Sequence, residues 1–192
     1  MLKFEFISLV LVFCFILYNL ILHKKGKDFY FCITSIVFGI YVLMLLNSCI
    51  FPIPFQKELL IDLRAENRME KKEVMLLPFY YIVDRIEIYG AEAVLLLFIK
   101  NILLFFPFTI YLQVLYPKVR KFKEMLKVLV CVATSIELVK GIIIFITKVY
   151  YKETCIDNII MYLVGGILGF YIYKIIIYLY NKIKNKKNEV NI

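Results

Sequence analysis

The chain has 192 residues, of which 62% are hydrophobic and 17% aromatic, and its net charge is +9. Its mean hydropathy is +0.81, whereas soluble domains carry only about half apolar residues. This composition excludes an ordinary soluble globular domain. The basic residues lie at the borders of apolar segments, where membrane orientation and attraction to anionic lipid account for them, so we expect no nucleic-acid partner.

Long apolar segments predict five membrane-spanning helices, because about 20 helical residues are needed to cross the hydrocarbon. The expected spans lie at residues 5–22, 29–51, 92–115, 128–149 and 157–180. The predicted fold class is therefore all-α, an integral membrane helical bundle that forms one domain over residues 1–192. The first segment lacks a basic n-region and a small-residue cleavage site, so we interpret it as a retained helix.

The connectors predict the orientation, because cytoplasmic loops are enriched in Lys and Arg. The first connector, the third connector and the tail at 181–192 are basic, and we place them in the cytoplasm. The second connector, at 52–91, holds seven acidic and six basic residues and is placed outside. The N-terminus is then outside and the C-terminus inside.

Cysteine and histidine give no sign of a cofactor. The five cysteines are scattered, four of them within apolar segments, and they form no disulfide framework. The one histidine, His23, has no second member with which to form a metal or catalytic cluster. We therefore expect neither a cofactor nor a metal site.

The second connector contains an aromatic strip beside a proline. Pro52 and Pro54 end the second span, and a charged segment that is helical or mobile follows. The strip at 76–82, with Pro78, Phe79 and Tyr80, is typical of a segment in the outer membrane interface. It is interpreted either as an aromatic belt that anchors the protein or as a ligand-contacting strip. Whether residues 74–90 re-enter the membrane stays open.

Polar residues within the spans carry the strongest functional signal, because a charge near the bilayer centre costs about 3 kcal/mol or more and persists mainly where it is paired or used. Glu137 lies near the middle of the fourth span, and Lys140 follows three residues later, at a spacing that permits an ion pair. Asn101 in the third span and Asp157 at the start of the fifth can converge with them in the outer half of the bundle. The alternative is interhelical hydrogen bonding that only holds the bundle together.

The fifth span contains Gly165 and Gly169. Their spacing of four residues creates a face of small side chains that allows another helix to approach closely. We assign these two glycines to helix packing.

With these segments the chain resembles the VanZ-like family of membrane proteins, named for a teicoplanin resistance protein. The likeness lies in Phe51-Pro52-Ile53-Pro54, Leu77-Pro78-Phe79, Asn101 to Phe108, Ser135-Ile136-Glu137, Cys155 to Asn158, and Gly165, Gly166 and Gly169. The chain departs from the family pattern at Thr109, where glycine is frequent, and at Lys140, where glutamine is frequent. It also has Asn158 and Tyr162 where an aspartate and an asparagine are usual.

The resemblance implies a multi-pass protein of the bacterial cell membrane, connected with resistance to teicoplanin and related lipoglycopeptides or with maintenance of the cell envelope. Our leading hypothesis is that the bundle binds an amphipathic ligand from the outer leaflet, either a lipid-linked envelope precursor or the lipid tail of an antibiotic. The expected ligand-binding residues are Asn101, Glu137, Lys140, Asp157, Pro78, Phe79 and Tyr80.

Two alternatives come from other functional classes. Glu137 and Asp157 are candidate catalytic residues of an intramembrane enzyme that acts by acid/base chemistry on a lipid-linked cell-wall substrate. A small proton-coupled transporter is the second, prompted by Glu137 beside Lys140. The sequence has no nucleophile elbow and no phosphate loop for the enzyme, and no internal repeat for the transporter.

Overall fold

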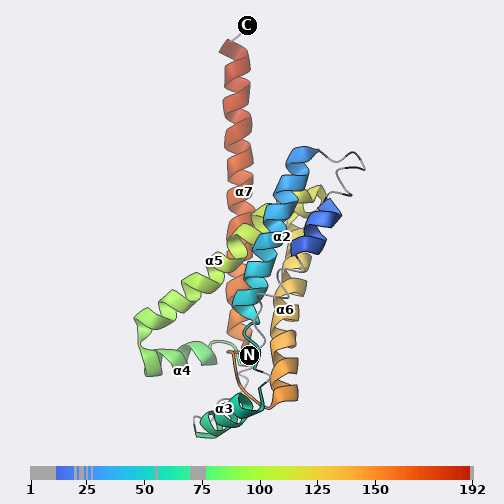
Figure 1. The fold of residues 1–192 in the computed structure, drawn as a ribbon. Coiled ribbons are helices and arrows are strands. Elements are labelled where there is room, and N and C mark those ends of the chain that lie inside the picture. Colours follow the sequence, from blue (N-terminus) through green and yellow to red (C-terminus); the bar gives the residue numbers. More distant parts are fainter. Residues whose placement is uncertain are drawn as a thin grey trace.

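The computed structural model describes residues 12–19, 21, 24, 26, 28–54, 56–69 and 77–190. The described residues are helical apart from short connectors, which confirms the all-α fold class (Figure 1). The helices are α2 (Phe29–Cys49), α3 (Lys57–Met69), α4 (Tyr80–Tyr89), α5 (Ala91–Leu115), the short 3-10 helix η1 (Pro117–Arg120), α6 (Phe122–Thr147) and α7 (Ile156–Val190).

Four of the described helices are long and apolar enough to cross a membrane, namely α2, α5, α6 and α7. They correspond to four of the five expected spans. The first expected span, 5–22, lies largely outside the described residues, of which 12–19 are helical. Between 22% and 39% of each apolar window is buried within the bundle, as expected for helices whose remaining surface contacts lipid.

Two helix boundaries differ from the expected ones by more than two residues. Helix α6 begins at Phe122, six residues before the expected span, because η1 ends the preceding connector and Lys123, Glu124 and Lys127 are good helix formers. Helix α7 continues to Val190, so most of the expected tail at 181–192 is helical. Charged residues indicate where a segment leaves the hydrocarbon of the membrane, but the helix itself can continue through them.

Helices α5 and α7 form the closest packed pair of the bundle. Gly165 and Gly169 of α7 face α5, where a Cβ on either would overlap the backbone oxygen of Ile102 or Phe106. Pro107 lies inside α5 and removes one backbone donor from its hydrogen-bond ladder. The hydroxyl of Tyr41 on α2 donates to the carbonyl of Leu104, so α2 is tied to α5 beside this proline.

The core lies where α2, α5, α6 and α7 meet. Phe105, Met125, Leu129 and Ala133 are completely buried there. The ring of Phe105 stacks on that of Tyr162, with the ring centroids 4.4 Å apart. These contacts fix the mutual positions of the four helices, and thereby of the polar groups between them.

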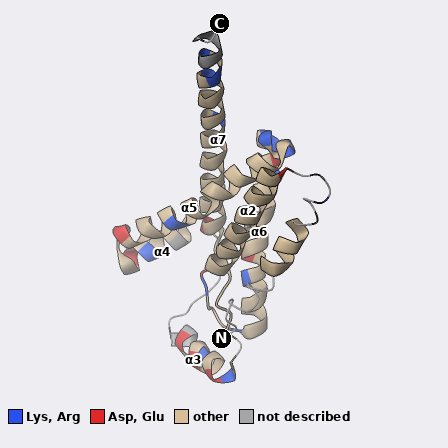
Figure 2. Ribbon diagram, turned by 45° about the horizontal axis from the view of Figure 1, so that its top comes forward, with Lys and Arg blue, Asp and Glu red and all other residues tan. Residues whose placement is uncertain are grey.

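The connectors lie at the two ends of the bundle (Figure 1). The start of α2, η1 and the far part of α7 are at one end, and η1 and the end of α7 carry Lys and Arg (Figure 2). Helices α3 and α4 and the connector at 148–155 are at the other end, and α3 and α4 carry charges of both signs. The structure thus separates a basic end from an end of mixed charge.

The aromatic strip of the second connector forms a turn and a short helix. Leu77, Pro78 and Phe79 make the turn, and Tyr80 begins α4, which has ten residues. A ten-residue helix is about 15 Å long, half of what crosses the hydrocarbon. The side chains of Phe79 and Tyr80 are exposed, as expected of aromatics at a membrane interface.

Candidate functional site

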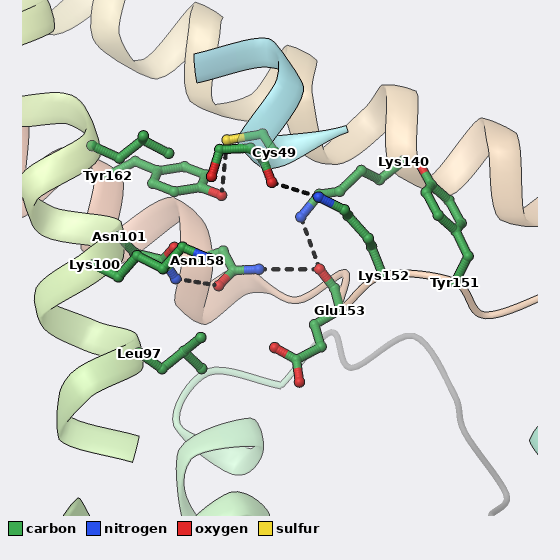
Figure 3. A pocket seen from close by; sticks show the side chains of 12 residues that line it. Cys49, Leu97, Lys100, Asn101, Lys140, Tyr151, Lys152, Glu153, Asn158 and Tyr162 are labelled. Atoms are coloured by element: carbon green, nitrogen blue, oxygen red, sulfur yellow. Dashed lines mark hydrogen bonds between the residues drawn. The ribbon is translucent and has the colours of Figure 1, made fainter. Parts of the chain in front are cut away.

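A network of polar contacts crosses the bundle from α5 to α6 (Figure 3). Asn101 donates an amide N–H to Oδ1 of Asn158 at 3.0 Å. Asn158 and Lys140 both donate to the backbone carbonyl of Glu153, at 3.2 and 2.8 Å. Lys140 Nζ also lies 2.6 Å from Oε1 of Glu137. The buried charges of Glu137 and Lys140 are therefore paired with each other, and Lys140 is hydrogen-bonded as well. Pairing is the condition under which charges are tolerated in a low-dielectric interior.

The C-terminal end of α2 closes the network on one side. Lys152 Nζ donates to the carbonyl of Ser48, one of the last carbonyls of the helix that lack an intrahelical partner. Cys49 Sγ lies 3.7 Å from the hydroxyl of Tyr162. The connector before α7 is thus fastened to α2 as well as to α6.

A polar cavity of about 320 Å³ lies between this network and the end of α2 (Figure 3). Its lining comes from α2, α5, α6, α7 and the connector at 151–153: Ser48, Cys49, Leu97, Lys100, Asn101, Leu104, Lys140, Tyr151, Lys152, Glu153, Asn158 and Tyr162. A water molecule occupies about 30 Å³ in the liquid. The cavity therefore has room for a polar group considerably larger than one water.

A second cavity, the apolar groove, has a volume of about 500 Å³ and lies between α6 and the beginning of α7. It is lined by Thr134, Glu137, Leu138, Gly141, Ile142, Phe145, Thr154, Cys155, Ile156 and Ile159. Leu138, Ile142 and Phe145 are exposed, so the groove adjoins the outer surface of α6. Glu137 lines the groove while Lys140 lines the polar cavity, so their ion pair lies between the two spaces.

The connector between α6 and α7 holds ionisable groups that are partly removed from water. Burial raises the pKa of Tyr151 to about 12, and the charge of Glu137 adds to the shift. Burial also raises the pKa of the Cys155 thiol to about 12. Burial lowers the pKa of Lys152, and the positive charges of Lys140 and Lys100 act in the same direction. At neutral pH, Tyr151 and Cys155 are therefore protonated.

Asp157 makes a different contact from the one expected of it. Its side chain is 1% exposed, and Oδ1 accepts the backbone N–H of Phe79 at 2.6 Å. This bond holds the turn in which Phe79 has a φ of 64°, a conformation that a non-glycine residue rarely adopts. Asp157 lines neither the polar cavity nor the apolar groove.

The expected site residues are thus divided between two places. Asn101, Glu137 and Lys140 belong to the polar network, whereas Asp157 belongs to the turn of the second connector. Pro78, Phe79 and Tyr80 lie at that turn, with exposed side chains. The groups of the network and those of the turn are joined through the first residues of α7.

Sequence reasoning missed the residues that the connector at 151–153 contributes. Tyr151, Lys152 and Glu153 lie in irregular chain, where no periodicity indicates which way a side chain points. The sequence does single out Lys100, because a lysine well inside a membrane span is costly unless it is paired or takes part in a functional site. The expected ligand-binding residues nevertheless included its neighbour Asn101 and not Lys100.

The four departures from the family pattern all take part in contacts between helices or within the site. Thr109 donates its hydroxyl to the carbonyl of Gly166 at 2.9 Å. Asn158 and Lys140 belong to the polar network, and Tyr162 contacts Cys49. These residues make a self-consistent local structure, in which a lysine balances the buried glutamate.

The chain was compared with known protein families and with known structures. The family model described as VanZ/LLP1 matches residues 38–177, which extend from the second half of α2 well into α7 and include both cavities. No curated protein and no solved structure shows a significant match to the chain.

Proposed function

The chain belongs to the VanZ/LLP1 family, and from this premise we propose that it binds an amphipathic ligand of the cell envelope at the outer leaflet. The observation that supports the proposal is that the polar cavity and the apolar groove are neighbours, with the ion pair of Glu137 and Lys140 between them. An amphipathic molecule has one part suited to each space. Ligand sites are commonly concave and largely apolar with a few placed polar groups.

The charges at the two ends of the bundle support the outer leaflet as the place of binding. Cytoplasmic connectors are enriched in Lys and Arg, and η1 and the end of α7 form the basic end (Figure 2). The cavity is lined from the connector at 151–153, which lies at the opposite end (Figure 1). In this orientation the N-terminus is outside, the C-terminus is inside, and the exposed Phe79 and Tyr80 lie in the outer interface.

Such binding would contribute to resistance against teicoplanin and other lipoglycopeptides, or to envelope maintenance. These antibiotics carry a lipid tail and act on envelope precursors, so a protein that holds either partner in the outer leaflet lowers the effective concentration of the drug at its target. An acid/base enzyme that uses Glu137 and Asp157 fits less well, because these two carboxylates share no cavity and Asp157 accepts the backbone N–H of Phe79.

The test is lipoglycopeptide susceptibility of a bacterial host that lacks the gene and is complemented with wild type, Asn101→Ala, Glu137→Gln or Glu124→Gln. Glu124 is the matched control, because it forms an exposed pair with Lys127 on the same helix. We expect wild type and Glu124→Gln to restore resistance and the other two to fail at equal membrane levels. Equal susceptibility of all strains would refute the proposal.

A further inference from the structure

The polar cavity has an excess of positive charge. Lys100, Lys140 and Lys152 line it, and Glu153 is the only carboxylate among the described lining residues. The carboxylate of Glu153 points away from the amines of Lys140 and Lys152 (Figure 3), and it lies 3.6 Å from Arg85. Glu137, from the neighbouring groove, neutralises Lys140. This leaves the charges of Lys100 and Lys152 without a carboxylate within ion-pair distance in the part of the chain that the structure describes.

Both of these lysines lie where an unbalanced charge is costly. Lys100 is ten residues into α5, counted from Ala91, within a membrane span. Lys152 is half-buried, and it lies close enough to Lys100 and Lys140 for their charges to oppose its own. An intramembrane lysine persists mainly where it faces a polar space and meets a partner there. An anion in the cavity would supply this partner for Lys100, and it would add a counter-charge for Lys152, whose amine donates to the carbonyl of Ser48.

Tyr151 also lines the cavity, but its hydroxyl is buried and has no hydrogen-bond partner among the described residues. Because a buried atom is shielded from a molecule in the cavity, the amines of Lys100 and Lys152 are the groups that would contact an anion there.

From this arrangement we propose that the polar cavity is a phosphate-binding site, in which Lys100 and Lys152 contact the oxygens of an isoprenoid or other lipid phosphate. The proposal rests on the proposed function and names the chemical class of its ligand. Lys140 does not contribute a free charge, since Glu137 holds it, but it sets the position of the Glu153 carbonyl and thereby of the connector. The lipid chain of the same molecule would lie against the apolar surface beside the cavity.

The test is equilibrium binding to the full chain in nanodiscs of a neutral lipid, with four probes: a long-chain polyprenyl phosphate, the polyprenol of the same length, phosphatidylglycerol and inorganic pyrophosphate. Wild type is compared with Lys100→Gln, Lys152→Gln and Lys127→Gln. Lys127 is the control, because it is an exposed lysine at the opposite end of α6. The unfolding temperature of each variant is recorded, so that a misfolded variant is recognised.

We expect saturable binding of the polyprenyl phosphate that weakens roughly tenfold or more in Lys100→Gln and in Lys152→Gln, as the loss of a charge-assisted hydrogen bond implies. Lys127→Gln should bind like wild type. The polyprenol should bind at least tenfold more weakly, because each such bond contributes about that factor. A strong preference for phosphatidylglycerol with the same lysine dependence would also support the phosphate site and would change only the lipid.

The remaining outcomes distinguish a failure of the phosphate site from a failure of the proposed function. Polyprenol that binds as tightly as its phosphate, with unchanged affinity in the lysine variants, would overturn the phosphate site while leaving an amphipathic ligand in place. Pyrophosphate that binds as tightly as the lipid phosphates would support the phosphate site but contradict a lipid ligand, and with it the proposed function. Binding of none of the four probes by folded protein would overturn the phosphate site.

Discussion

Helix α6 carries two ion pairs of the same residue types and spacing in two different environments. Glu137 and Lys140 are 2.6 Å apart, with side chains 7% and 3% exposed. Glu124 and Lys127 are 2.9 Å apart, with side chains 47% and 62% exposed. In the exposed pair the charges are available to solvent or headgroups, whereas the buried pair has in addition the carbonyl of Glu153 as a fixed partner.

The comparison shows that sequence spacing allows the two side chains of such a pair to meet. It does not determine how much the pair contributes to stability. An exposed pair with this spacing contributes about 0.2 to 0.5 kcal/mol. Removing one member of a buried pair costs about 3 to 5 kcal/mol, because the remaining charge is left uncompensated. The buried pair can therefore fix the connector at 151–153 and the cavity that it lines, and the exposed pair cannot.

The largest expected effect is that of Glu137→Gln, which leaves Lys140 buried without its counter-charge. We expect it to destabilise the protein by about 3 kcal/mol or more, measured as unfolding in detergent by circular dichroism. The matched variant Glu124→Gln should change the unfolding free energy by no more than about 0.5 kcal/mol. If both variants lost the same amount, the distinction between the two pairs would be wrong.

A smaller effect is expected at another buried carboxylate. Asp157→Ala leaves the Phe79 amide without its acceptor, which costs about 1.5 to 3 kcal/mol for a bond to a charged group. Hydrogen exchange followed by mass spectrometry should show faster exchange in the turn at 77–79 and the first turn of α4. Asp84→Ala, at a more exposed carboxylate, is the control. Unchanged protection of the turn would contradict the role assigned to Asp157.

The same contrast between interior and surface applies to two glycines. Gly165→Ala places a methyl group against the backbone of Ile102, and we expect it to cost about 1 to 3 kcal/mol, as overpacking does. Gly141→Ala meets nothing within 4 Å and should stabilise α6 by up to about 1 kcal/mol. Thermal unfolding of the two variants provides the measurement. If Gly141→Ala were destabilised and Gly165→Ala were neutral, the results would contradict the packing described for these two glycines.

The smallest effect concerns the titration of Lys152. Burial, together with the charges of Lys140 and Lys100, lowers its pKa below the ordinary lysine value of 10.5. Its neutral amine therefore forms at a lower pH, and anion binding should weaken as the pH rises through the lowered pKa. The rate of acylation of Lys152 against pH, followed by mass spectrometry with Lys127 as the reference, measures this titration. A midpoint at or above 10.5 without ligand would disagree with the account.

The lowered pKa of Lys152 also determines how its contribution to the free energy of unfolding changes with pH. In the pH range between the lowered pKa and 10.5, the unfolded chain binds more protons at Lys152 than the folded chain does. The contribution of this group to the free energy of unfolding therefore becomes more favourable as the pH rises through that range. Below it, the penalty for a charged, half-buried Lys152 is fully present.

Four of the five expected spans could be predicted because apolar length alone distinguishes a membrane helix. The pairing of Glu137 with Lys140 also followed from spacing, and Asn101 was recognised as an intramembrane polar group. What the sequence could not show was the partner of Asp157 or the side chains of the connector at 151–153. Their positions depend on long-range contacts of irregular chain, such as that between Lys152 and Ser48, which leave no periodic signal.

The central claim is that Lys100 and Lys152 face the phosphate of a bound lipid. Solid-state NMR of the protein in vesicles that contain polyprenyl phosphate, with ¹⁵N at the lysine side chains, measures the dipolar coupling between ¹⁵Nζ and ³¹P. We expect a coupling that decreases in Lys152→Gln and in Lys100→Gln and is unchanged in Lys127→Gln. Absence of coupling in the wild type, or equal coupling in all variants, would contradict it.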